Sequence, residues 1–295
     1  MDEKNPFGIF INNDALADRV LERLTKAVDT VLKVADQETM ITKLTVPNEP
    51  DGMEISFHTQ TQDLAYEKPE LGETPAQKRL KQLKAEDRLR QWEVRLPVSD
   101  EAMKNKQGTG ANLMSSIGAG KAFARAMDAE GFQNMYGALS GTVVSAPWNL
   151  GTNATMENDI NLRMDAIEDE GFSGDSALMS RMQIGRLNHT LNVIMFGGRG
   201  ITVKDWLMDN MELELYRVKR INYKNNNGTL IPLFNPFGQI LIFDKSAYSV
   251  FTQEPMTVKV QRKEEIGAWI TYIRKYFRTT PVQTEACEKL IGVNL

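Results

Sequence analysis

The chain has 295 residues, of which 41% are hydrophobic, and this is enough for one large folded domain or two smaller ones. The formal net charge of −4 argues against a general nucleic-acid-binding protein, because such proteins carry an excess of basic residues. A single cysteine, Cys287, excludes an internal disulfide, and no apolar run reaches membrane-spanning length. Because the first residues also lack the pattern of a secretory signal, we expect an intracellular protein without redox or membrane chemistry.

The N-terminal 40 residues predict an irregular arm followed by an amphipathic helix. Residues 1–13 are rich in Asn, Pro and Gly, and Asp14 has the chemistry of a helix cap. Apolar residues then recur at spacings of three and four, at Leu21, Leu24, Val28, Val31 and Ala35. This stripe either docks on a partner or packs on its own domain, and the second use is the commoner one and is favoured here.

Residues 41–98 predict a long excursion from the body of the chain. Residues 53–61 and 92–98 alternate apolar and polar residues with the period of half-buried strands. Between them, residues 78–90 hold six basic and two acidic residues and are predicted to form a charged helix with too few apolar residues for a local core. We therefore expect the excursion to find its apolar partner elsewhere, on another copy of the chain. The candidate inter-subunit contacts are Met53, Ile55, Phe57, Lys78, Arg79, Lys81, Lys84, Arg88 and Trp92.

The basic residues of this excursion admit a second interpretation, which is contact with nucleic acid. Aromatic residues that could stack on bases are not interleaved with them, and Glu86 and Asp87 interrupt the run. A protein-contact or solvent-facing role is therefore favoured.

The rest of the chain predicts helices first and strands later. Residues 111–137 favour a long helix with a face of small residues, in which Gly118 and Gly120 require close packing or a bend. An acidic helix is expected at 155–170, a short helix at 176–187 and a strand at 190–196. Further strands are expected at 211–223, 230–233, 239–243, 256–261 and 268–277, with a hairpin turn at 225–228, while 206–211 is ambiguous. This order predicts an α+β fold.

No motif in the sequence predicts a catalytic, cofactor or metal site. Residues 116–122 superficially resemble a phosphate-binding loop, but Ser115 and Ala122 stand where that motif needs glycine and a hydroxyl residue. The two histidines, His58 and His189, have no ligand spacing around them, and Cys287 is interpreted as a small packing residue. The acidic residues at 165–175 lack the alternating ligands of a calcium loop.

The order of elements resembles the major capsid proteins of tailed bacteriophages with the HK97-type fold. Three stretches carry the resemblance besides the layout: VRLPVSDEAM at 94–103, ILIFDKSAY at 240–248 and TPVQTEACEKLIGV at 280–293. The resemblance implies an HK97-like capsid fold with an N-terminal arm, an extended loop, a spine helix, and peripheral and axial domains. It divides the chain into residues 1–40 for the arm and first helix, 41–98 for the extended loop, 99–190 for the spine helix and first part of the peripheral domain, and 191–295 for the axial domain and returning peripheral strands.

The same resemblance implies a structural protein rather than an enzyme. Its copies would assemble as pentamers and hexamers into an icosahedral shell, the capsid of a virion, around viral DNA that is enclosed without sequence-specific binding. A separate scaffolding protein and a portal are expected partners, with no membrane and no cofactor. One alternative is an encapsulin-type compartment that encloses an enzyme cargo, and another is a soluble enzyme with a regulatory arm.

Overall fold

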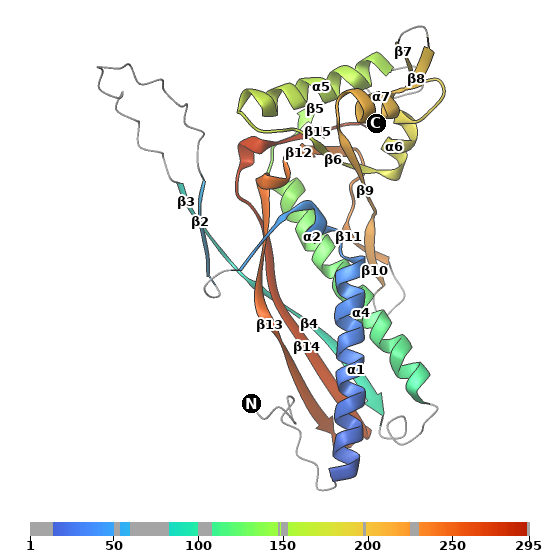
Figure 1. The fold of residues 1–295 in the computed structure, drawn as a ribbon, viewed down its shortest axis with the longest axis vertical. Coiled ribbons are helices and arrows are strands. Elements are labelled where there is room, and N and C mark those ends of the chain that lie inside the picture. The colour runs from blue at the N-terminus through green and yellow to red at the C-terminus, as the bar shows by residue number, and fades with distance from the viewer. Residues whose placement is uncertain are drawn as a thin grey trace, which may run out of the picture. The chain divides into compact units, whose positions relative to one another are not determined.

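The computed structural model describes residues 14–49, 54–59, 83–99, 108–146, 148, 153–196, 199–224 and 230–293. The chain divides into two compact units. Figure 1 shows the chain coloured along its sequence, from blue at the N-terminus to red at the C-terminus. Unit 1 comprises Met1–Ile55, Arg88–Gly131 and Val250–Arg278, and unit 2 comprises Ser56–Asp87, Phe132–Ser249 and Thr279–Leu295. Because each unit gathers segments that are distant in sequence, neither coincides with one of the four contiguous regions predicted above.

Unit 1 combines long helices with a four-stranded sheet. Its helices are α1 (Asp14–Glu38), α2 (Ile41–Leu44) and the part of α4 (Gly108–Gly137) up to Gly131. The sheet has the order β1-β13-β14-β4, with β1 at Val46–Asn48, β13 at Tyr248–Lys263, β14 at Ala268–Pro281 and β4 at Arg90–Ser99. A 3₁₀ turn, η2 (Glu264–Ile266), connects the long strands β13 and β14.

The apolar stripe of α1 packs inside unit 1, as favoured from its spacing. Val28 and Val31 are buried against Ala119 of α4 and against Leu96 and Ile273 of the sheet. One turn further on, Ala35 joins a second cluster with Phe123, Met127 and Phe277. The same face of α1 therefore packs against both α4 and the sheet.

Two close contacts fix α4 within unit 1. A Cβ atom added at Gly120 would lie 2.8 Å from the Val31 carbonyl oxygen, so the backbones of α1 and α4 approach here as only glycine allows. Eight residues further along α4, the Asp128 carboxylate accepts hydrogen bonds from the backbone N–H groups of Met40 and Ile41, at 2.8 and 3.0 Å. This carboxylate satisfies N–H groups at the start of α2 that have no partner within the helix.

Unit 2 is built on a five-stranded sheet of order β5-β15-β12-β6-β9. The strands are β5 (Thr142–Val143), β15 (Cys287–Ile291), β12 (Gln239–Phe243), β6 (Ser176–Ser180) and β9 (Glu214–Val218). The central strand β12 runs antiparallel to β15 and β6, while β6 and β9 run parallel to each other. The helices are α5 (Asn153–Asp169), α6 (Arg181–Leu187) and α7 (Val203–Asn210).

Unit 2 also contains two short antiparallel pairs outside this sheet and two 3₁₀ turns. The pairs are β7 (Val193–Phe196) with β8 (Arg199–Thr202), and β10 (Ile221–Lys224) with β11 (Leu230–Phe234). The turns are η1 (Lys245–Ala247) and η3 (Thr284–Ala286).

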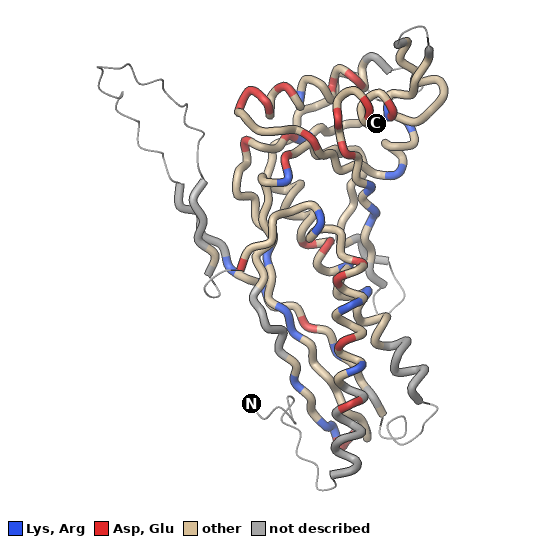
Figure 2. The backbone as a smooth tube through the Cα atoms, viewed as in Figure 1, with Lys and Arg blue, Asp and Glu red and all other residues tan. Residues whose placement is uncertain are grey.

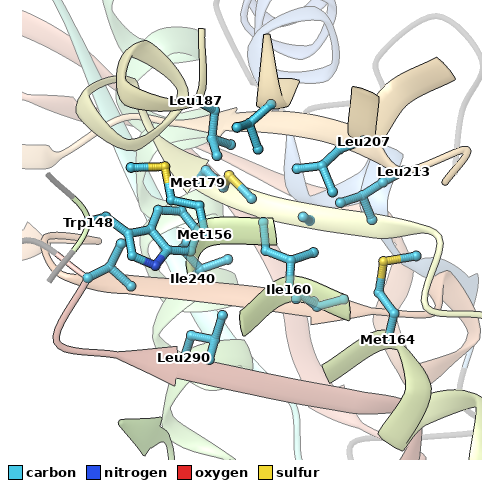
Figure 3. Packing of buried hydrophobic residues seen from close by; sticks show 14 of the residues in the cluster. Trp148, Met156, Ile160, Met164, Met179, Leu187, Leu207, Leu213, Ile240 and Leu290 are labelled. Atoms are coloured by element: carbon cyan, nitrogen blue, oxygen red, sulfur yellow. The ribbon is translucent and has the colours of Figure 1, made fainter. Parts of the chain in front are cut away.

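The core of unit 2 lies between α5 and the sheet (Figure 3). Met156, Ile160 and Met164 recur at spacings of four along α5 and are buried against Ile240 of β12 and Leu290 of β15. Trp148 enters the same core with its side chain fully covered, and its indole N–H donates to the Asp159 carboxylate at 3.0 Å. Asp159 is therefore a structural acceptor on the acidic helix α5.

Most predicted elements are confirmed, including α1, α4, α5, β4 and the strands of the last third. The charged helix predicted at 78–90 is wrong where the structure describes it: β3 (Leu83–Arg88) pairs with β2 (Glu54–Thr59) in a two-stranded sheet. The helix predicted at 176–187 is wrong in its first half, which is the buried strand β6. The ambiguous segment 206–211 lies mainly in α7. The predicted arm at 1–13 and the hairpin turn at 225–228 lie outside the described residues.

Among the helices that the structure describes, none combines the length and the apolar character needed to cross a membrane.

Candidate assembly surfaces

Strand β4, the second strand of the predicted excursion, is covered within the chain. It pairs with β14 over all ten of its residues, from Arg90 opposite Phe277 to Ser99 opposite Ala268. The Trp92 indole stacks on the Phe277 ring with the centroids 5.4 Å apart. The expectation that this strand needs another copy of the chain for its apolar face is therefore wrong.

The nine candidate contact residues fall into two groups. Ile55 is only 1% exposed and Trp92 is half-buried, so both already have partners in the chain, whereas Arg88 is exposed. The remaining candidates lie outside the described residues or have side chains that do: Met53, Phe57, Lys78, Arg79, Lys81 and Lys84. Contact of all nine residues with a neighbouring subunit stays a prediction.

Two groups of charged side chains lie along β4 and β14 in unit 1. The Glu93 carboxylate accepts from Arg95 Nε at 2.8 Å and from Arg274 Nε at 2.7 Å, and these two hydrogen bonds lower the Glu93 pKa. The buried Glu130 carboxylate of α4 accepts a hydrogen bond from Arg278 at 2.9 Å. The second pair fixes the C-terminal part of β14 to α4.

The surface of unit 2 exposes several large apolar side chains. Met195 is 74% exposed on β7, Leu191 is 61% exposed just before that strand, and Phe237 is 54% exposed between β11 and β12. Val143 on the edge strand β5 is 67% exposed. Single exposed apolar residues are common on proteins, but four of them on one unit favour contacts with other protein surfaces.

A basic groove lies at the C-terminal ends of β6 and β9. It has a volume of about 460 Å³, and its lining includes Arg181, Arg217, Lys219 and Arg220 together with Met182 and Phe237. All four basic residues are exposed, and Figure 2 shows Lys and Arg along this part of β9. Among the described residues, none of these four cations has an ion-pair partner.

An acidic groove lies at the opposite, N-terminal ends of the same two strands. Its volume is about 510 Å³, and its lining includes Glu168, Asp175, Glu212 and Glu214. Glu214 accepts hydrogen bonds from Lys245 Nζ at 2.8 Å and from the Tyr216 hydroxyl, and both lower the pKa of Glu214. Across the described residues, no group of His, Cys, Asp or Glu side chains has an arrangement that could hold a metal ion.

The single cysteine is part of a buried hydrogen-bonded cluster in unit 2. The Cys287 thiol donates to the Thr284 carbonyl at 3.2 Å, and the Tyr248 hydroxyl lies 3.3 Å from Cys287 Sγ and 3.0 Å from the Met135 carbonyl oxygen. Burial raises the pKa of Cys287 to about 11. The interpretation of Cys287 as a packing residue is confirmed by its 2% exposure.

His189 and Lys121, which the sequence analysis considered as candidate site residues, interact with neighbouring groups of the chain. His189 accepts a hydrogen bond from the backbone N–H of Leu191 through Nδ1, at 3.2 Å. Residues 116–122 lie inside α4, not in a loop after a strand, and Lys121 forms an ion pair of 3.7 Å with Glu38. The helical position of residues 116–122 agrees with the rejection of a phosphate-binding loop.

The acidic groove is not evident from the sequence, whereas the basic groove has a local sequence signal. The acidic residues at 168, 175, 212 and 214 are brought together by the parallel pairing of β6 with β9, which no local pattern predicts. The run RVKR at 217–220 is visible in the sequence and was the available signal for the basic groove.

The sequence matches no protein-family model and no curated protein. Its structure, however, is similar to solved structures over most of its length. A virus-like particle from Pyrococcus furiosus matches with a TM-score of 0.63 at 8% identity, covering 90% of this chain and 98% of that one. A phage-related protein from Bordetella bronchiseptica RB50 matches with a TM-score of 0.61 at 13% identity, covering 90% and 96%.

The capsid of the cyanophage P-SCSP1u matches with a TM-score of 0.57 at 13% identity, covering 87% of this chain and 89% of that one. At such identities the likeness is one of fold. The predicted mixed fold of HK97-type capsid and shell proteins is therefore confirmed.

Proposed function

We propose that this protein is the subunit of a closed protein shell and that its activity is self-assembly. The observation that carries the proposal is the match of nearly the whole chain to shell-forming structures, including two phage capsids that cover 87% and 84% of it. Exposed apolar residues on unit 2, such as Met195 and Leu191, support it because they are suited to contacts between subunits.

The finer proposal is a major capsid protein of a tailed bacteriophage. Its copies form pentamers and hexamers of an icosahedral shell around viral DNA, with a separate scaffolding protein and a portal as partners. The negative net charge suits this role, since a basic inner wall would bind the genome tightly. Enclosure needs no sequence-specific contact with the DNA.

An encapsulin-type compartment is the second candidate. The similarity to the virus-like particle from Pyrococcus furiosus, which covers 98% of that chain, favours it. Both candidates predict a closed shell and differ in what the shell encloses.

Expression of the chain, followed by electron microscopy and absorbance at 260 and 280 nm, tests these proposals. Closed particles support the shell function. Co-expression with the neighbouring genes of the source genome then separates the two candidates, because a capsid fills with nucleic acid and a compartment with protein. A protein that stays monomeric at every concentration and salt tested would contradict the shell function.

A deletion tests the role of the predicted extended loop. Removing residues 60–82 and joining β2 to β3 through a short Gly-Ser turn leaves β4 and its pairing with β14 intact. We expect a folded subunit that forms no closed particles. A wider deletion that includes β4 would remove Trp92 and Leu96 from the core of unit 1 and would confound assembly with folding.

A further inference from the structure

Charges are segregated along the edge strand β9 of unit 2. Glu212 and Glu214 lie at its start, and Arg217, Lys219 and Arg220 lie at its end and just beyond. A strand of five residues is about 17 Å long, so the two charge groups are well separated on one edge of the sheet. Figure 2 shows the two signs of charge at different parts of this region.

The basic end has the composition of a protein contact. Four exposed cations surround one groove, and they repel one another when nothing is bound there. Phe237 and Met182, which are 54% and 42% exposed, supply apolar area beside them. Arginine and aromatic residues are the types enriched in protein interfaces.

The acidic end is opposite in charge to the basic end. Its groove of about 510 Å³ compares with about 460 Å³ for the basic groove, and each has four charged residues in its lining. Glu214 is paired with Lys245, while Glu168, Asp175 and Glu212 have no ion-pair partner among the described residues. Three carboxylates of the acidic groove are therefore available to pair with the four cations of the basic groove of a second copy.

We propose that the basic groove of one copy docks on the acidic groove of the next copy. This inference rests on the proposed shell function and names the surfaces that join neighbouring subunits within a ring. Because the two grooves are different surfaces of the same unit, the contact is head-to-tail, and such contacts close into rings when the rotation between copies fits. Electrostatic complementarity sets the register of neighbours and raises the rate of association.

A second copy explains the observations better than nucleic acid does. A polyanion would account for the basic groove alone and would be repelled by the acidic groove at the other end of the same strands. A second copy accounts for both grooves at once.

Charge reversal provides the test. The variant R217E/K219E leaves the basic groove with two charges of each sign, and the variant E168K/E212K does the same to the acidic groove. Each variant alone therefore sets like charges against one another at the substituted positions of neighbouring copies. For each variant alone we expect the concentration required for assembly to rise about tenfold or more. The fourfold variant exchanges the signs at all four substituted positions and restores opposite charges between them, so we expect it to assemble close to the wild-type level.

Mixing the two double variants gives a sharper outcome. They should co-assemble in alternation, and alternation permits rings with an even number of subunits but not pentamers. Native mass spectrometry of the mixture therefore should detect hexamers and no pentamers. The control is E285K, which changes the charge at an exposed residue of unit 2 outside both grooves and should assemble like the wild type.

Salt dependence of the wild-type protein tests the contact without any substitution. Charge pairs at an interface are screened, so we expect a higher assembly concentration as NaCl rises from about 0.05 to about 0.5 M. Normal assembly of both double variants would overturn the inference, as would closed dimers as the only assembled form. Loss of DNA binding by R217E/K219E with unchanged assembly would also overturn it and would assign the groove to a polyanion. If the wild type itself forms no particles, it is the proposed function that fails.

Discussion

Burial determines the chemistry of the only thiol in the chain. Because the pKa of Cys287 is raised from 9.0 to about 11 by burial, about one thiol in a thousand is ionised at pH 8. We expect reaction of the native protein with a disulfide reagent at pH 8 to be slower by at least about a hundredfold than reaction of the protein unfolded in guanidinium. Absorbance of the released thiol measures both rates, and equal rates would show that Cys287 is accessible.

The same shift gives a pH dependence with a definite sign. The folded state holds the Cys287 proton more tightly than the unfolded state, so its contribution to stability is complete below pH 9 and is lost as pH rises through about 11. We expect Cys287→Ala to remove this part of the decrease in unfolding free energy between pH 9 and 11. Denaturant titrations at pH 8, 9, 10 and 11 check it, and an unchanged pH profile would contradict it.

Asp128 is a second residue whose role follows from its partners. Its carboxylate accepts hydrogen bonds from two backbone N–H groups at the start of α2. We expect Asp128→Ala to lower the unfolding free energy by about 1–2 kcal/mol, as for loss of a helix-capping group. Chemical denaturation of the unassembled subunit measures the change. Asp36→Ala, at an exposed position of α1, serves as the control and should change stability by less than about 0.5 kcal/mol.

At the scale of elements, two glycines of α4 form a matched pair. A Cβ atom at Gly120 would lie 2.8 Å from both the Val31 carbonyl oxygen and Val34 Cβ, whereas at Gly118 nothing lies within 4 Å. We expect Gly120→Ala to destabilise unit 1 by about 1–3 kcal/mol, because the backbone of α1 must move. Gly118→Ala should instead stabilise the subunit by up to about 1 kcal/mol, since alanine favours a helix over glycine. Melting temperatures of the two unassembled variants should therefore shift in opposite directions.

Helices with a clear period of 3.6 residues were predictable, whereas the strands β3 and β6 were wrongly predicted to be helical. The stripe of α1 and the acidic helix α5 bury the residues that their spacing indicates, such as Val31 and Ile160. In β6, four consecutive residues are buried, so the strand has no alternation and its short apolar run is indistinguishable from a helix. In β3, the charged sequence LKAEDR favours a helix, but pairing with β2 overrides that local preference.

The strand that pairs with β4 could not be predicted from the sequence either. Alternation from Trp92 to Val98 predicts a half-buried strand without indicating which surface covers it. The paired strand is β14, about 180 residues further along the chain, and the apolar face of β4 packs against Val31 of α1 and Phe123 of α4. Periodicity identifies a buried face, whereas topology determines the partner of that face, and the assignment to another copy failed at this second step.

At the scale of the whole molecule, each unit has a buried core of its own. Val31, Phe123 and Ile273 are covered within unit 1, and Trp148, Ile160 and Ile242 within unit 2. Folding of either core therefore requires no neighbouring subunit. In the proposed shell, assembly adds burial of surface that the folded subunit leaves exposed, including the charged ends of β9 and the apolar side chain of Phe237.

Hydrogen exchange can separate folding from assembly on this basis. In the dissociated subunit we expect slow amide exchange in α4, β12 and β14, with protection close to that in the assembled particle. Amides of residues 219 and 220, which follow β9, and of the turn at Phe237 should exchange quickly in the subunit and at least about tenfold more slowly in the particle, because a neighbour covers them there. Fast exchange throughout α4 and β14 in the dissociated subunit would mean that the core of unit 1 forms only on assembly. In that case the shell would be built by coupled folding and association instead of by docking of folded subunits.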